Sequence, residues 1–151
     1  MSPETRARVG LAARLLLAAL FLFSGLEKAW APAEDFAAVV EAYKLVPPEL
    51  LMPFATLLPL AEIVLGLSLL LGAFVRAACA GAALLNLVFI AALASTLARG
   101  LELESCGCFG GVHLTPLQAM SVDAFMIALA VLAWRGAGTL FALDGWMDGG
   151  D

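Results

Sequence analysis

The sequence predicts an all-α membrane protein, a four-transmembrane-helix bundle with a short amphipathic helix in the first extracytoplasmic loop. Composition predicts the membrane class: 63% of the residues are hydrophobic and 14% are charged, whereas soluble domains average roughly 45–50% and about 25%. The mean hydropathy of +0.99 agrees. Long apolar segments predict helices, because a helix satisfies its own backbone polar groups inside a bilayer. At 151 residues, the chain is expected to form a single integral membrane domain, residues 1–151.

The charge of the chain limits its partners. A net charge of −5 argues against nucleic acid, because no basic stripe is present to meet phosphates. Eight Lys and Arg residues in the whole chain also argue against a polybasic lipid-binding patch. The lipid bilayer is therefore the partner that composition predicts.

The first apolar segment predicts a helix over residues 9–30. Its uncharged part is short for a spanning helix, which needs about 20 apolar residues, so Arg14 is expected to extend to the membrane interface. A signal peptide with a cleavage site at residues 29–31 is the alternative interpretation. Glu27 and Lys28 are unusual just before such a site, and the later helices would lose a partner.

The segment after this helix, residues 33–48, is polar but periodic. Apolar residues recur in it at three- and four-residue spacing: Phe36, Val39, Val40 and Tyr43. This pattern predicts a short amphipathic helix lying on the membrane surface. Pro47 and Pro48 are expected to end it.

Three further transmembrane helices are predicted, over residues 53–74, 77–97 and 117–134. Arg76 indicates a tight turn between the first two of them. Residues 77–83 are almost all small, which is the composition that lets membrane helices pack closely. A compact four-helix bundle is the expected architecture.

The distribution of basic residues predicts the orientation. Four helices place both termini on one side, and that side holds five of the eight basic residues: Arg6, Arg8, Arg14, Arg76 and Arg135. The opposite side holds Lys28, Lys44 and Arg99. By the positive-inside rule, both termini are cytoplasmic in a multi-pass protein of the cell inner membrane. The cysteine loop, residues 98–116, is then extracytoplasmic, where disulfides persist.

The cysteine loop contains Cys106 and Cys108, separated by Gly107. The pair forms a disulfide only if the chain bends to bring the Cα atoms within about 4.4–6.8 Å, and glycine permits that bend. So small a ring is expected to be strained, and strained disulfides are the labile, catalytic ones. A redox pair is the favoured interpretation. Two alternatives stay open: a loop with a purely structural role, and a metal site using Cys106, Cys108 and His113, although its spacing is not that of the usual zinc sites.

Ionisable residues collect in the outer half of the predicted bundle, beneath the cysteine loop. Because a charge at membrane depth is costly, Glu62 and Asp123 are candidate proton acceptors. The structural alternative is a pair of Glu62 with Lys28 or Asn86 that fixes the helix register. Four residues make up the expected polar cluster: Glu27, Lys28, Asn86 and Arg99. Cys79 is expected to be a small packing residue.

Several of these segments together resemble DoxX-like membrane proteins, and within them the MauE type, named for methylamine utilisation. The resemblance extends over roughly residues 13–132. It rests on Ser24-Gly25-Leu26-Glu27-Lys28, on Leu58-Pro59-Leu60-Ala61-Glu62 and on Cys106-Gly107-Cys108-Phe109-Gly110. It implies a four-helix membrane protein that works beside thioredoxin-like partners in forming or rearranging disulfides of an exported enzyme. In the methylamine pathway, that enzyme is methylamine dehydrogenase.

Three functional hypotheses follow. The first is a membrane thiol oxidoreductase, in which Cys106 and Cys108 exchange disulfides with an exported thioredoxin-like protein and a quinone held among the helices accepts the electrons. The second is a non-enzymatic membrane scaffold or assembly factor that docks such a partner through the first loop. The third is a carrier of a small metal or thiophilic ion that uses Cys106, Cys108 and Cys79.

Overall fold

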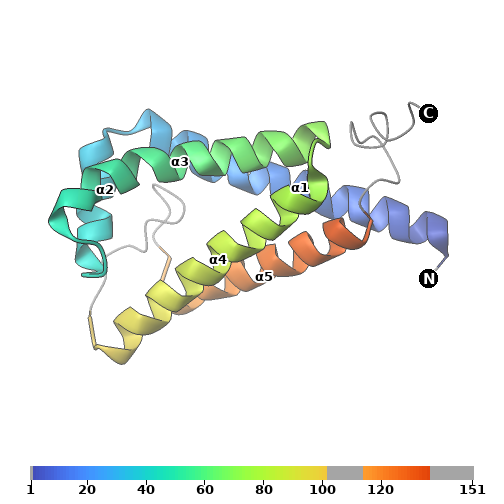
Figure 1. The fold of residues 1–151 in the computed structure, drawn as a ribbon. Coiled ribbons are helices and arrows are strands. Elements are labelled where there is room, and N and C mark those ends of the chain that lie inside the picture. The colour runs from blue at the N-terminus through green and yellow to red at the C-terminus, as the bar shows by residue number, and fades with distance from the viewer. Residues whose placement is uncertain (1, 102–113, 137–151) are drawn as a thin grey trace.

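The computed structural model describes residues 2–101 and 114–136. These residues form five helices and, within the described ranges, no strand (Figure 1). The helices are α1 (Pro3–Trp30), α2 (Ala33–Ala42), α3 (Pro48–Leu71), α4 (Val75–Ala98) and α5 (Pro116–Arg135). All but α2 are long and apolar enough to cross a membrane. The prediction of an all-α membrane protein with four spanning helices and a short additional helix is confirmed.

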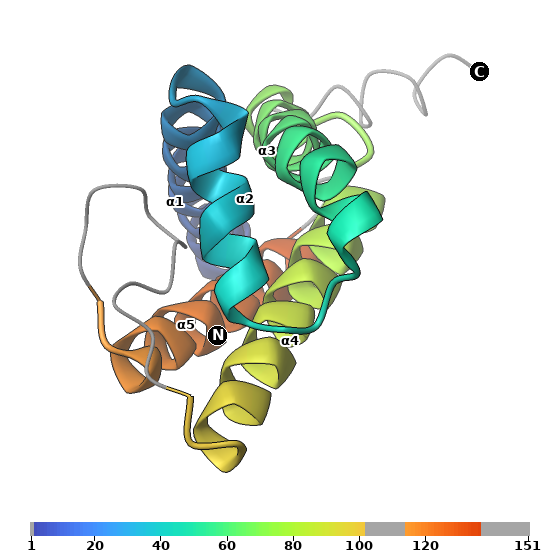
Figure 2. The ribbon, with the colours of Figure 1, turned by 90° about the vertical axis from the view of Figure 1, so that its left-hand side faces the viewer.

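The four long helices run side by side in alternating directions. Figure 1 shows the beginning of α1, the turn between α3 and α4 and the end of α5 at one end of the bundle. The other end, the α2 end, holds α2, the end of α4 and the beginning of α5. Helix α1 packs against α3 and α5, and α4 packs against α5. Helices α3 and α4 diverge from their shared turn toward the α2 end (Figures 1 and 2).

Helix α3 begins earlier than predicted, at Pro48 instead of residue 53. Proline fits the first turn, because the N–H groups of that turn have no partner within the helix. The helix ends at Gly72, whose left-handed backbone (φ 70°) closes it. Helix α4 then starts at Val75, so the expectation that Arg76 lies in the turn is wrong, since this residue lies in the first turn of α4.

The amphipathic helix exists but packs on protein. Helix α2 ends at Ala42, ahead of the prolines that were expected to end it, and Pro48 starts α3 instead. Its residues Ala37 and Val40 are buried against Leu51 and Ala55. The apolar face of α2 was expected to contact the membrane. In the structure, the first turns of α3 cover this part of it instead.

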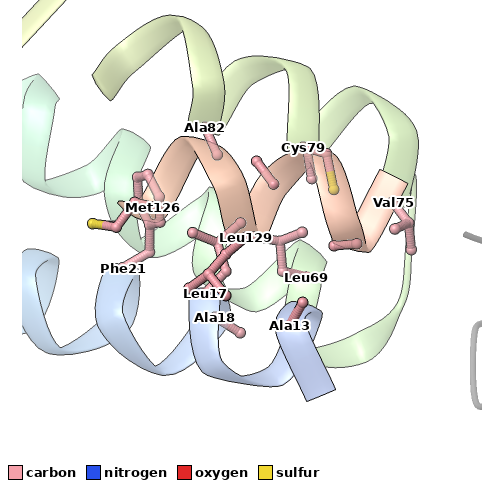
Figure 3. Packing of buried hydrophobic residues seen from close by; sticks show 13 residues of the cluster. Ala13, Leu17, Ala18, Phe21, Leu69, Val75, Cys79, Ala82, Met126 and Leu129 are labelled. Carbon is pink, nitrogen blue, oxygen red and sulfur yellow. The ribbon is translucent and has the colours of Figure 1, made fainter. Parts of the chain in front are cut away.

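The main hydrophobic core lies between α1, α3, α4 and α5 (Figure 3). Leu17 and Leu69 are fully buried in it, and Cys79, 1% exposed, packs there as predicted. Arg14 does not extend outward as expected, because its side chain is enclosed by the fold and only 4% exposed. Two glycines, Gly10 and Gly136, bring the backbones of α1 and the end of α5 into contact.

Candidate functional site

An ion pair between α1 and α3 is the centre of the candidate site. The ammonium of Lys28 donates hydrogen bonds to both carboxylate oxygens of Glu62, each at 2.9 Å. Both side chains are 3% exposed. The hydroxyl of Ser24 donates to the same carboxylate at 3.3 Å and accepts a hydrogen bond from Lys28. The structural pairing of Glu62 with Lys28, which the sequence left open, is therefore present.

The local sequence explains how this pair forms. Ser24 and Lys28 are four residues apart, so they lie on one face of α1. Gly25 lets that face approach α3 closely: a Cβ atom there would lie 2.9 Å from Cγ1 of Ile63 and 3.0 Å from the carbonyl oxygen of Pro59. Burying two charges is costly unless they are paired and hydrogen-bonded. The close approach of the two helices supplies both conditions.

Four polar side chains, one from each long helix, face a small internal space. They are Ser24, Glu62, Asn86 and Asp123, and we call them the polar centre. The last three are each 2% exposed. The space measures about 10 Å³, close to the minimum that holds one water molecule. Asn86 also donates to the carbonyl oxygen of Ala82 at 2.7 Å.

Two members of the predicted polar cluster lie elsewhere. Arg99 is exposed at the end of α4, where its guanidinium donates to the carbonyl oxygens of Tyr43 at 2.6 Å and Lys44 at 3.5 Å. These hydrogen bonds link the end of α4 to the segment that connects α2 with α3. Glu27 is half-buried and borders a shallow depression beside Phe23 and Trp30. Neither Arg99 nor Glu27 lines the small internal space that the polar centre faces.

A second, larger cavity lies between α2, α3 and α4. Its volume is about 170 Å³ and its surface is almost wholly apolar. Among the described residues that line it, Lys28 is the only charged one, and its Nζ lies 5.7 Å from the ring centroid of Phe36. The sequence alone does not indicate this cavity, although one of its walls is formed by the residues of the amphipathic pattern: Phe36, Val39, Val40 and Tyr43. We call it the apolar cavity.

The cysteine loop falls largely outside the described residues. Cys106, Cys108 and His113 lie in that range. The described residues that flank it, Leu101 and Leu114, follow α4 and precede α5 at the α2 end. Within residues 2–101 and 114–136, no group of three potential metal ligands occurs.

Comparisons with known proteins place the chain among its relatives. The family model for methylamine utilisation protein MauE matches residues 6–138. A methylamine utilization protein MauE of Paracoccus denitrificans is 36% identical over 127 residues, which are 83% of this chain and 68% of that protein. One of Methylophilus methylotrophus is 43% identical over 76 residues, 50% of this chain and 40% of that protein. No solved structure matches.

The matched range includes the polar centre, the cysteine loop and all four long helices except the first three residues of α1. A family match over most of the chain and a relative of 36% identity point to the same assignment. The chain therefore belongs to the MauE family.

Proposed function

We propose that this MauE-family protein is a membrane thiol oxidoreductase that supports the formation of disulfides in exported proteins. Cys106 and Cys108 cycle between dithiol and disulfide and exchange with an exported thioredoxin-like protein through a mixed disulfide. The names of the relatives associate them with methylamine utilisation, and we extend that process to this chain. The observation that carries the proposal is the buried polar centre, in which one polar side chain from each membrane-spanning helix faces a single small space.

The proposed chemistry is balanced by a quinone as electron acceptor. Oxidation of two thiols to a disulfide releases two electrons and two protons, and reduction of a quinone to a hydroquinone takes up both. The protons need carriers in an apolar surrounding. Glu62 and Asp123, which face one space large enough for a water molecule, are the groups that we assign to this task.

The proposed orientation follows from the distribution of the basic residues between the two ends of the bundle. The end of the bundle opposite α2 holds Arg6, Arg8, Arg76 and Arg135. We assign this end to the cytoplasm and the α2 end to the outside of the inner membrane. Cys106 and Cys108 then face a compartment in which thioredoxin-like proteins exchange disulfides.

The test is oxidation of a reduced thioredoxin-like protein by the purified protein in liposomes that contain a quinone. We expect the wild type to oxidise it and the double variant Cys106→Ser, Cys108→Ser to have no activity above empty liposomes. Cys79→Ala is the matched control, because it removes the thiol that is buried in the core, and it should keep the activity. Oxidation by the double variant would overturn the proposal.

A non-enzymatic assembly factor is the second candidate. The exposed face of α2 carries three acidic residues, Glu34, Asp35 and Glu41, so the α2 end presents a charged surface to a soluble partner. If docking is the function, reversing these three charges to lysine should abolish co-purification of the partner, and the double cysteine variant should leave it intact. The opposite pattern would exclude this candidate.

A further inference from the structure

We propose that the apolar cavity binds the head group of a single-ring quinone, with Lys28 at the inner wall of the site and Glu62 behind it, hydrogen-bonded to Lys28. The assignment rests on the proposed function for the source of the electrons. The size, the lining, the access and the charge of the cavity support the binding site itself.

The size and lining of the cavity fit one flat ring. Its volume is about 170 Å³, and an apolar cavity of about 150 Å³ is known to stay dry and to bind benzene. Four aromatic side chains, Phe36, Tyr43, Phe54 and Phe89, contribute to the walls. Aromatic rings pack well against other rings, in stacked or edge-to-face geometry.

The cavity is open to the side of the bundle where lipid would lie. It occupies the space that α3 and α4 leave as they diverge, with α2 across it (Figure 2). Two of its lining residues, Phe54 and Val88, are also exposed at the outer surface. Their neighbours Leu57 and Leu84 are exposed and apolar as well, as expected of a lipid-facing surface. A ligand dissolved in the bilayer would therefore reach the cavity without crossing water.

Charge at the inner wall distinguishes a quinone from a lipid tail. The Lys28 ammonium lies against the aromatic wall and is held by Glu62 and Ser24. A cation in a low-dielectric site stabilises negative charge that develops on a nearby carbonyl oxygen during reduction. An acyl chain gains nothing from this charge. The Lys28 charge at the wall therefore favours a ring with carbonyl groups over an acyl chain as the occupant.

The polar centre lies on the other side of the same wall. Phe89 lines both cavities, and Lys28, which lines the apolar cavity, is hydrogen-bonded to Glu62 of the polar centre. Protons needed at the ring would thus pass from Asp123 through the small space to Glu62 and Lys28. The two cavities form one site with a lipid-facing and a polar half.

The test is direct binding of decylubiquinone, a single-ring probe, to the protein in phospholipid nanodiscs without an electron donor. We expect saturable binding to the wild type and a loss of affinity of about tenfold or more for Ala92→Phe, which fills the cavity. Ala91→Phe is the matched control, because Ala91 is exposed on the same helix and does not line the cavity. It should bind as the wild type does.

A second pair of variants guards against misfolding. Val88→Phe narrows the mouth of the cavity at a residue that is 51% exposed, and Leu87→Phe changes its 53% exposed neighbour. Only the first should weaken binding. The proposal would be overturned if the wild type showed no saturable binding, or if both members of each pair bound equally. Lipid would then be the occupant of the cavity. Binding without oxidation of a thioredoxin-like protein would contradict only the proposed function.

Discussion

At the scale of single residues, the Lys28–Glu62 pair combines deep burial of both side chains with direct hydrogen bonds between them. Each charge is buried inside a helix bundle and is compensated chiefly by the other. Removing one partner leaves a buried charge without compensation, which is far more costly than removing both. The sequence predicted this pair as one alternative for Glu62. It did not predict Ser24, although a hydroxyl four residues before Lys28 was a readable signal.

The pair makes a double-mutant cycle informative. Lys28→Met and Glu62→Gln should each lower the free energy of unfolding by about 3–5 kcal/mol, because each leaves a buried group without its ionic partner. The double variant should lower the free energy of unfolding by clearly less than the sum of the two single changes. Unfolding in mixed detergent measures all three proteins. Strict additivity would mean that the two side chains do not interact in the folded protein.

At the scale of elements, the sequence predicted which segments are helical. It did not predict correctly what α2 packs against or where α3 begins. Periodicity reports which face of α2 is apolar, but it does not report whether lipid or protein covers that face. The prolines near residue 48 indicate the end of a helix, whereas Pro48 occupies the first turn of α3. The first error concerns which elements contact each other, and tertiary packing decides that. The second arises because proline fits both the residues after a helix and the first turn of the next one.

Close packing of α1 on α3 depends on glycine, which a matched pair of substitutions can test. Gly25→Ala should lower the free energy of unfolding by about 1–3 kcal/mol, since its Cβ meets the Pro59 carbonyl at 3.0 Å, and backbone does not yield easily. Gly81→Ala should be neutral or stabilising, because its Cβ meets only the flexible end of Leu65 and alanine favours the helix by about 1 kcal/mol. Thermal unfolding in detergent compares the two. Equal effects would contradict the close approach.

At the scale of the whole molecule, the arrangement of the helices creates the candidate site. The polar centre needs one side chain from each long helix, and the apolar cavity needs α3 and α4 to diverge beneath α2. The sequence placed Glu62, Asn86 and Asp123 in the outer half of the bundle, and in the structure these three side chains face one space. The cavity could not be predicted, because a void is defined by how closely helices approach, and composition alone does not determine that distance.

The orientation of the whole molecule in the membrane decides whether the proposed chemistry is possible, and single introduced cysteines test it. Glu34 in α2 and Arg76 at the opposite end are both exposed, so Glu34→Cys and Arg76→Cys report the two ends. The background is Cys79→Ala, Cys106→Ser, Cys108→Ser, which removes every native thiol. In spheroplasts, a membrane-impermeant maleimide should label Glu34→Cys directly and Arg76→Cys only after lysis. The reverse pattern would place the cysteine loop in the reducing cytoplasm, where a stable disulfide between Cys106 and Cys108 is not expected.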